Sequence, residues 1–163
     1  VFEMDADLSH NPKDIKRISV DYDERIPNLE SFVITQKNKK IQITNSKTKL
    51  TQDLTDSEIG LQYLGFFKHL EIEGFENDYP KKDSIIKSKP FCEIEIEQAN
   101  GKITSADIYL MDLNQRSKTQ FDRKGNQLQY DLDRMFVSFN EGKDFGILQM
   151  FVFGKLFQNY SSF

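Results

Sequence analysis

The sequence contains no tryptophan, one cysteine and two histidines in 163 residues. A single thiol, Cys92, cannot form an internal disulfide, so cysteine usage leaves the cellular compartment open. We interpret Cys92 as a small residue on a strand rather than a nucleophile, because nothing places His10 or His69 beside it. A zinc site needs a cluster of His and Cys ligands, and these three residues lack motif spacing. We therefore predict no metal and no cofactor.

Signature motifs of catalysis are missing as well. There is no Gly-rich phosphate loop and no serine nucleophile elbow. Two stretches, "DADLSHNPKD" and "DYDERIPNLE", begin like calcium loops, but neither supplies the central glycine that such loops require. We assign no catalytic residue and predict a protein that is not an enzyme.

Long hydrophobic runs are also absent. The most apolar stretch, "GKDFGILQMFVFGKLF", has nine apolar residues among the thirteen from Phe145 to Phe157. A membrane-spanning helix needs about 20, so we predict no transmembrane segment. The apolar residues point in nearly all directions around a helix, which is typical of a buried helix or of a central strand covered on both faces. We favour a buried helix over 144–158 and regard the stretch as core, with a cavity for a lipid or cofactor as the alternative.

The overall composition indicates one folded domain, 1–163. Hydrophobic residues make up 37% and charged residues 29%, which argues against intrinsic disorder. The net charge of −4 argues against a general affinity for nucleic acid. A polar linker near 76–90 separates two stretches with a similar order of strands followed by a helix, so one hypothesis is two similar halves. The chain begins at Val1 rather than Met, from which we expect a processed or excised piece of a longer chain.

Alternating apolar residues predict antiparallel hairpins. "IKRISVDY" places Ile18, Val20 and Tyr22 on one face of a strand. "SFVITQKNKKIQITN" predicts a hairpin with its turn at Asn38 and Lys39, although the usual glycine is missing. "FCEIEIEQANGKITSADIYLMDL" predicts a second hairpin, with a strong turn signal at Asn100-Gly101. "TQFDRKGNQLQY" predicts a third, turning at 124–126.

Helical patterns occur at three places. "LTDSEIGLQYLGFFKHL" has helical apolar spacing, and Thr55 with Glu58 matches a capping box, so we predict a helix near 55–72. Further helices are predicted at 131–140, with Asp131 at its start, and at 144–158. The predicted fold class is α+β, with antiparallel hairpins forming one or two sheets packed against a few helices.

Two polar groups are candidates for function. "YDLDR" contains Tyr130, Asp131, Asp133 and Arg134, which we predict as a small binding site for an anionic or sugar group, the alternative being a helix cap with surface charges. The glutamates of "CEIEIE" share one strand face, with neighbours roughly 7 Å apart. They are either a solvated face that protects an edge strand or a pair of carboxylates for acid–base hydrolysis.

Three phrases resemble a known class of proteins: "LQYLGFFKHLEIEGF", "FDRKGNQLQYDLDRMF" and "GKDFGILQMFVFGKLF". Together they resemble uncharacterised bacterial envelope lipoprotein domains, mainly over 55–75 and 90–157. The resemblance implies a periplasmic or surface-exposed protein, lipid-anchored through a cysteine upstream of Val1. It carries no functional residue.

The sequence therefore predicts a non-enzymatic binding or assembly domain of the bacterial cell envelope, of unknown molecular function. Its partner is expected to be an envelope protein or a glycan. The alternatives are a carrier of a lipid or sugar with a Phe-rich pocket, and a hydrolase that depends on carboxylates.

Overall fold

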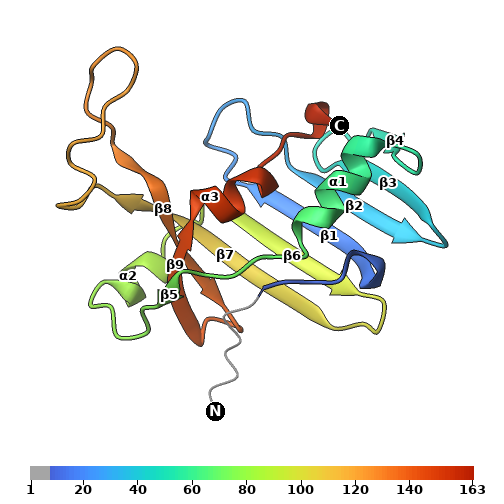
Figure 1. The fold of residues 1–163 in the computed structure, drawn as a ribbon, viewed down its shortest axis with the longest axis horizontal. Helices are drawn as coiled ribbons and strands as arrows, with labels where there is room; N and C mark the ends of the chain where they lie inside the picture. Colours follow the sequence, from blue (N-terminus) through green and yellow to red (C-terminus); the bar gives the residue numbers. More distant parts are fainter. Residues whose placement is uncertain (1–7) are drawn as a thin grey trace.

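The computed structural model describes residues 8–163, which form one open nine-stranded antiparallel sheet and three short helices (Figure 1). The order of strands across the sheet is β4-β3-β2-β1-β6-β7-β8-β9-β5. The strands are β1 (Ile15–Tyr22), β2 (Phe32–Lys37), β3 (Lys40–Asn45), β4 (Thr51–Asp53), β5 (Gly74–Phe75), β6 (Cys92–Gln98), β7 (Ile103–Asp112), β8 (Tyr130–Phe139) and β9 (Asp144–Gln149). The helices are α1 (Glu58–Phe66), α2 (Lys82–Ile86) and α3 (Met150–Phe153). The molecule is thus dominated by its sheet, which is compatible with a sheet-rich α+β fold.

The first two predicted hairpins are confirmed. β2 and β3 pair from Phe32 opposite Asn45 to Lys37 opposite Lys40, and their turn places both Asn38 and Lys39 at positive φ. Such angles fit the twist of the flanking strands, and asparagine adopts them more readily than most residues. The turn therefore forms without the usual glycine, at a modest cost in backbone strain. β6 and β7 form the second hairpin around Asn100-Gly101.

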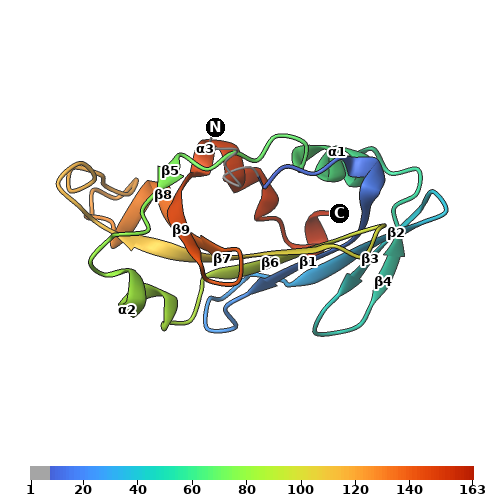
Figure 2. The same cartoon turned by 90° about the horizontal axis from the view of Figure 1, so that it is seen from below.

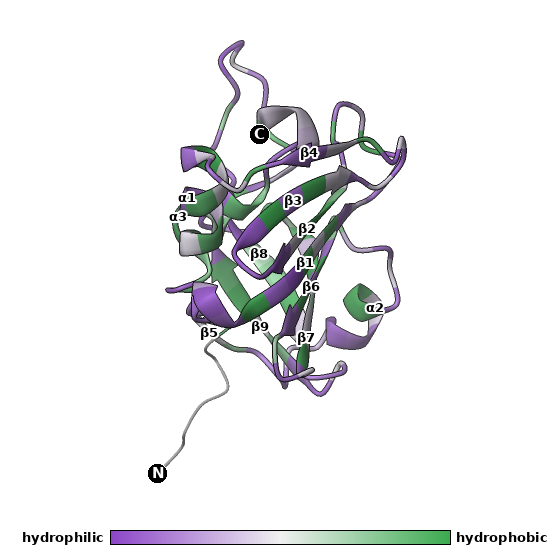
Figure 3. Ribbon diagram, turned by 90° about the vertical axis from the view of Figure 1, so that its right-hand side faces the viewer, coloured by the Kyte–Doolittle hydropathy of each residue, from purple (hydrophilic) through white to green (hydrophobic). Residues whose placement is uncertain are grey.

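The sheet separates two hydrophobic cores. Helices α1 and α3 and the C-terminal segment lie over one face, and α2 lies on the other (Figure 2). The larger core lies under α1 and α3, and includes Phe32, Phe67 and Phe139. The smaller core is built from Tyr109, Met111, Phe136 and Phe145, with Ile85 and Ile86 of α2 packed against it. Along the strands hydrophobic and hydrophilic residues alternate, whereas the projecting loops are mainly hydrophilic (Figure 3).

The predicted helix at 131–140 is wrong, because this segment forms β8. The residues from Met135 to Phe139 are all buried, with Met135, Val137 and Phe139 in the larger core and Phe136 in the smaller one. A strand covered on both faces reads as a nearly continuous apolar run, and such a run can be mistaken for a helix.

The predicted helix at 144–158 is also largely wrong. Its first part is β9, and only the four residues of α3, followed by a 3-10 turn at Gly154–Leu156, are helical. The alternative of a central strand covered on both faces describes β9 better, since Phe145 faces the smaller core and Leu148 the larger one.

The predicted helix near 55–72 is confirmed only over α1, and its expected cap is wrong. Ser57 is the N-cap residue, and its side chain accepts a hydrogen bond from the Gly60 amide at 3.3 Å. Thr55 instead donates its hydroxyl to Asp53 at 2.5 Å and accepts the Ile41 amide at 3.2 Å, which ties the start of the helix to β3 and β4.

The predicted linker at 76–90 runs around the far edge of the sheet. Just before it, β5 pairs with β9, and the chain then forms α2 on the opposite face before entering the centre of the sheet as β6. Both stretches beside it have four strands in a row and then a helix, β1 to β4 with α1 and β6 to β9 with α3. The relation between the two halves stays a prediction.

Candidate functional site

The four predicted binding residues lie at the start of β8, where Asp131 and Asp133 share Arg116 as a partner and the other two have partners of their own. The carboxylate of Asp131 is fully buried and forms an ion pair with Arg116. Its Oδ1 also accepts the amides of Asp133 at 2.7 Å and Arg134 at 3.2 Å. A helix N-cap residue binds the amides two and three residues further on in the same way. Asp131 therefore makes the hydrogen bonds expected of a cap, although the residues that follow it form a strand.

Arg134 turns toward β5 instead. Its guanidinium donates to both oxygens of Glu73, at 2.6 and 2.8 Å. These bonds hold the pKa of Glu73 below its usual value and raise the pKa of Arg134. The hydroxyl of Tyr130 accepts a bond from Gln129 at 3.3 Å. The network therefore joins β8 to the preceding loop and to β5, and the structure does not bring the four residues to one shared cavity.

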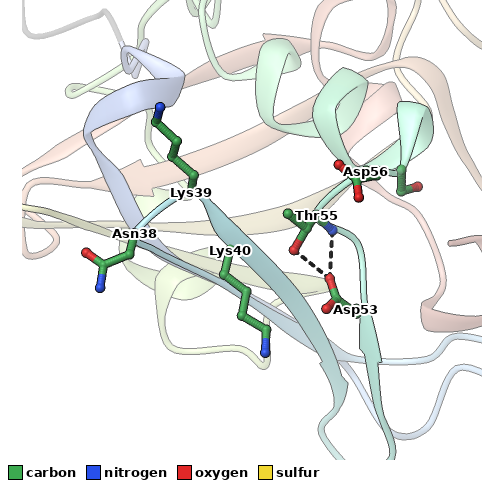
Figure 4. A pocket seen from close by; sticks show the side chains of 7 residues that line it. Asn38, Lys39, Lys40, Asp53, Thr55 and Asp56 are labelled. Carbon is green, nitrogen blue, oxygen red and sulfur yellow. Dashed lines mark hydrogen bonds between the residues drawn. The ribbon is translucent and has the colours of Figure 1, made fainter.

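One open pocket of about 690 Å³ lies between the β2–β3 turn and the start of α1 (Figure 4). It is lined by Asn38, Lys39, Lys40, Asp53, Thr55, Asp56 and Ser57. The side chains of Lys39 and Lys40 extend in opposite directions, and the Asp53 carboxylate is occupied by Thr55. The charged groups of this pocket do not converge on one position.

A second pocket, which we call the acidic groove, lies beside two loops at the end of the sheet where β1 and β3 finish. It measures about 650 Å³ and is formed by the end of β1, the β1–β2 loop, the β3–β4 loop and the entry to β6. Both loops hang from the face of the sheet that carries α2 (Figure 2). The groove is lined by five carboxylates and two lysines, namely Asp21, Asp23, Glu24, Glu30, Glu93, Lys47 and Lys89.

Three carboxylates stand in a row across the sheet at this groove. Asp21 of β1 is the direct neighbour of Glu93 of β6, which in turn is the neighbour of Asp107 of β7. Side chains opposite one another on adjacent strands have Cβ atoms about 5 Å apart, so like charges there repel. Partial burial and the charges of Asp107 and Asp21 raise the pKa of Glu93, and burial raises the pKa of Asp107. Tyr109, further along β7, has its pKa raised to about 12, by burial and by the charges of Asp107 and Glu93.

The other two glutamates of β6 have cationic partners. Glu95 pairs with Arg17 at 3.4 Å and Glu97 with Lys16 at 3.1 Å, both from β1. Within residues 8–163, neither Asp21 nor Glu93 forms an ion pair. Lys89 instead contacts Asp23 and Glu24 at 3.5 Å. The three glutamates that the alternation placed on one face thus have different environments, and only Glu93 lines the groove.

The charge of Asp23 is balanced by Arg25 in the same loop. Its buried carboxylate accepts the Arg25 guanidinium at 2.6 Å and the Arg25 amide at 3.0 Å. These bonds hold the pKa of Asp23 well below its usual range. The β1–β2 loop is thereby tied back on itself, and the Asp23 charge is balanced within the loop.

Sequence reasoning missed the groove because its key neighbours are far apart in the chain. The strand pattern did place Asp21 on the polar face of β1 and Glu93 on the polar face of β6. The missing information was that β1 and β6 are adjacent in the sheet with Asp21 opposite Glu93. No local turn or spacing reports that pairing.

Cys92 is a buried strand residue, as predicted, and burial raises the pKa of its thiol. The Phe-rich stretch packs against the larger core, where the space beside Phe153 and Leu156 is about 20 Å³. Binding sites for small molecules usually measure about 300–1,000 Å³, so this space fits no lipid.

Across residues 8–163, no three His, Cys, Asp or Glu side chains are grouped so that they could hold a metal ion. Asp5 and Asp7, from the first calcium-like stretch, lie outside that range. None of the helices in the same range has the length and apolar character needed to span a bilayer.

Comparisons with known proteins returned no match: no family model, no curated protein and no solved structure is similar to this chain.

Replacing Glu93 with glutamine is expected to raise the melting temperature at pH 7 by about 1–3 °C. Because the folded-state pKa of Glu93 is raised, its ionisation favours the unfolded chain, and stability is lost as the pH rises through that pKa. The advantage of Glu93→Gln should therefore shrink as the pH falls toward 4.5, the ordinary pKa of the group. Thermal unfolding of both proteins across this pH range is the measurement.

Glu95→Gln is the matched control, because it removes a charge that Arg17 already balances. We expect it to leave the melting temperature unchanged or to lower it. A fall in melting temperature for Glu93→Gln at pH 7 would show that the row of carboxylates is not repulsive.

Proposed function

We propose that this chain is a non-enzymatic binding or assembly domain that holds a positively charged segment of a partner protein in the acidic groove. The observation that carries the proposal is Asp21 opposite Glu93 at the groove, neither of which forms an ion pair among the described residues, whereas Glu95 and Glu97 on the same strand each have one. Lys89 also lines the groove and lowers the pKa of Glu93, but its ion pairs are with Asp23 and Glu24. A lysine or arginine of a partner would supply the missing charge.

Energetics support this assignment. Like charges on neighbouring strands cost about 0.2–1 kcal/mol, and this cost is relieved when a cation binds between them. A cleft lined mainly by one sign of charge also concentrates its field and speeds association with an oppositely charged partner. An arginine could bind both carboxylates through its planar, forked guanidinium.

The excess of carboxylates in the groove favours a protein over a glycan, the two kinds of partner expected from the sequence. A basic protein segment can form ion pairs in a groove with five carboxylates and two lysines, whereas a neutral glycan forms none there and an acidic glycan is repelled. We further propose that the domain works in the bacterial cell envelope, facing the periplasm or the surface and anchored by lipid upstream of Val1, as the resemblance over 55–75 and 90–157 implies.

Neither alternative function has a supporting observation of its own. The carrier requires a Phe-rich cavity, and the space there is about 20 Å³. The hydrolase requires two of its candidate carboxylates in one concave site, but only Glu93 lines the groove, while Asp131 and Asp133 are bound by Arg116 at another end of the sheet.

Binding of short labelled peptides tests the proposal. We expect a peptide rich in arginine and lysine to bind, with an affinity that falls as salt is added, and a peptide of the same length with glutamates not to bind. In the double variant Asp21→Asn/Glu93→Gln the affinity should fall by at least about tenfold, which corresponds to about 1.4 kcal/mol.

Glu95→Gln is again the control, since it changes the net charge on the same strand outside the groove. It should bind the basic peptide like the unmodified protein. Equal affinity of the double variant and the unmodified protein would refute the acidic groove as the binding site.

A further inference from the structure

A long loop, residues 113–129, projects from the sheet between β7 and β8, away from the acidic groove. It is the orange loop at the upper left of Figure 1, and the view of Figure 2 also shows it extending beyond the end of the sheet. The predicted hairpin at this place is only partly formed, because a single bridge joins Phe121 to Gln127.

The loop is nevertheless held in a defined shape. At its base, Asn114 and Arg116 contact the buried Asp131, and Gln120 accepts the Leu132 amide at 3.0 Å. At its tip, Asp122 accepts the amides of Lys124 and Asn126 at 2.8 and 2.9 Å, and Gly125 takes the positive φ that the turn requires. The tip is thus organised before any partner binds, which lowers the entropy lost on binding.

The tip combines one exposed apolar side chain, Phe121, with positive charge, and a second exposed apolar residue lies beside the base of the loop. Phe121 is 56% exposed and Leu132, beside the base of the loop, is 57% exposed. Between 113 and 129 the chain has four cationic residues, Arg116, Lys118, Arg123 and Lys124, and one carboxylate, Asp122. This sign is opposite to the net charge of −4 of the whole chain. Isolated exposed apolar residues are common, but an exposed ring set among cations on a projecting, ordered tip is not explained by solubility.

We infer that the tip of this loop binds the surface of an anionic lipid membrane, with Phe121 entering the headgroup region and Lys118, Arg123 and Lys124 facing the lipid phosphates. The Phe121 ring is apolar, and burying it in the apolar part of the membrane–water interface removes its exposed surface from water. Basic side chains near an anionic leaflet each strengthen binding by about fivefold. A flat surface can be reached by a projecting tip, whereas a nucleic-acid strand needs a longer basic track than this acidic chain offers. The inference does not depend on the acidic groove, which lies elsewhere on the sheet.

Sedimentation with lipid vesicles tests this inference on the whole 163-residue chain. We expect the protein to bind vesicles of equal parts phosphatidylcholine and phosphatidylglycerol and not to bind phosphatidylcholine alone. Arg123→Glu/Lys124→Glu should weaken binding by at least about twentyfold, and Phe121→Ser by about fivefold. Both variants change exposed side chains, so their melting temperatures should match that of the unmodified protein.

Lys39→Glu/Lys40→Glu is the matched control, because it reverses two charges at another exposed tip that has no apolar side chain in its pocket. It should bind the anionic vesicles like the unmodified protein. An equal loss in the control variant would overturn the inference, because binding would then follow net charge alone. No binding to the anionic vesicles, equal binding to both vesicle types, or binding only to a free single-stranded oligonucleotide would also overturn it.

Discussion

Replacing Asp131 with alanine is expected to lower the free energy of unfolding by about 3 kcal/mol. The Asp131 side chain is fully buried and binds the Arg116 guanidinium, the Asn114 amide and two backbone amides of β8. Alanine leaves these donors without their acceptor. Removing one partner of a buried pair typically costs about 3–5 kcal/mol, and the lower figure applies here because Arg116 is 42% exposed and can reach water. Chemical denaturation measures the loss.

The same substitution should release the loop at 113–129. Its base is attached to β8 through the buried Asp131, with further bonds to Asp133 and to the Leu132 amide, and its tip offers Arg123 and Lys124 to trypsin. We expect faster cleavage there in Asp131→Ala, while the rest of the sheet stays resistant. The rate of cleavage under native conditions is the measurement.

Asp133→Ala is the control for both results. Its carboxylate is 64% exposed and contacts Arg116 at 3.4 Å and the Gln120 amide group at 2.9 Å, both in contact with water, so the substitution should cost less than about 1 kcal/mol. If Asp131→Ala is no more destabilising than Asp133→Ala, the buried carboxylate does not hold the loop.

The sequence predicted the strands whose two faces differ in polarity and failed where they do not. In β2, β3 and β6 apolar and polar residues alternate, and a short turn brings each neighbouring strand back, so pattern and pairing are both local. β8 and β9 are covered by α3 on one side and α2 on the other. Because both faces are buried, apolar residues in these strands do not alternate with polar ones. The sequence pattern then fits a helix as well as a strand. The assignment depended on a second core that only the tertiary structure reveals.

The same limit applies to the candidate sites. The density of charge in 130–134 is visible in the sequence, but each of its charges has a structural partner such as Arg116 or Glu73, the latter 61 residues away from Arg134. In the sequence, Glu93 is one of three glutamates on a strand face and Asp21 begins a calcium-like stretch, but nothing there connects the two residues. They become a candidate site because the β1–β6 pairing places them side by side. The order and register of the strands decide whether a charged residue has an opposite charge beside it. A candidate site for a charged ligand is therefore visible only once the topology is known.

Replacing Gly146 with alanine is the other substitution with a large expected effect, about 3 kcal/mol of destabilisation. Gly146 lies in β9 opposite Phe75 of β5. A Cβ atom at this position would lie 2.5 Å from the Gly74 carbonyl oxygen and 2.9 Å from Ile72 Cδ1. The obstacle is mainly backbone, so a change of side-chain rotamer cannot relieve it, and the two strands must move apart.

The consequence should be confined at first to the edge of the sheet. The Glu73 amide donates to Ile147 at 2.8 Å and the Glu76 amide donates to Phe145 at 2.7 Å, and both bonds depend on the close approach of β5 and β9. In Gly146→Ala, hydrogen exchange at these two amides should accelerate more than exchange at the β1–β6 pair in the centre of the sheet. Gly65→Ala is the control, because no atom lies within 4 Å of the added methyl group and alanine favours the helix, so stability should rise by about 0.5–1 kcal/mol. Unchanged stability in Gly146→Ala, with normal protection at Glu73 and Glu76, would mean that β5 does not approach β9 this closely.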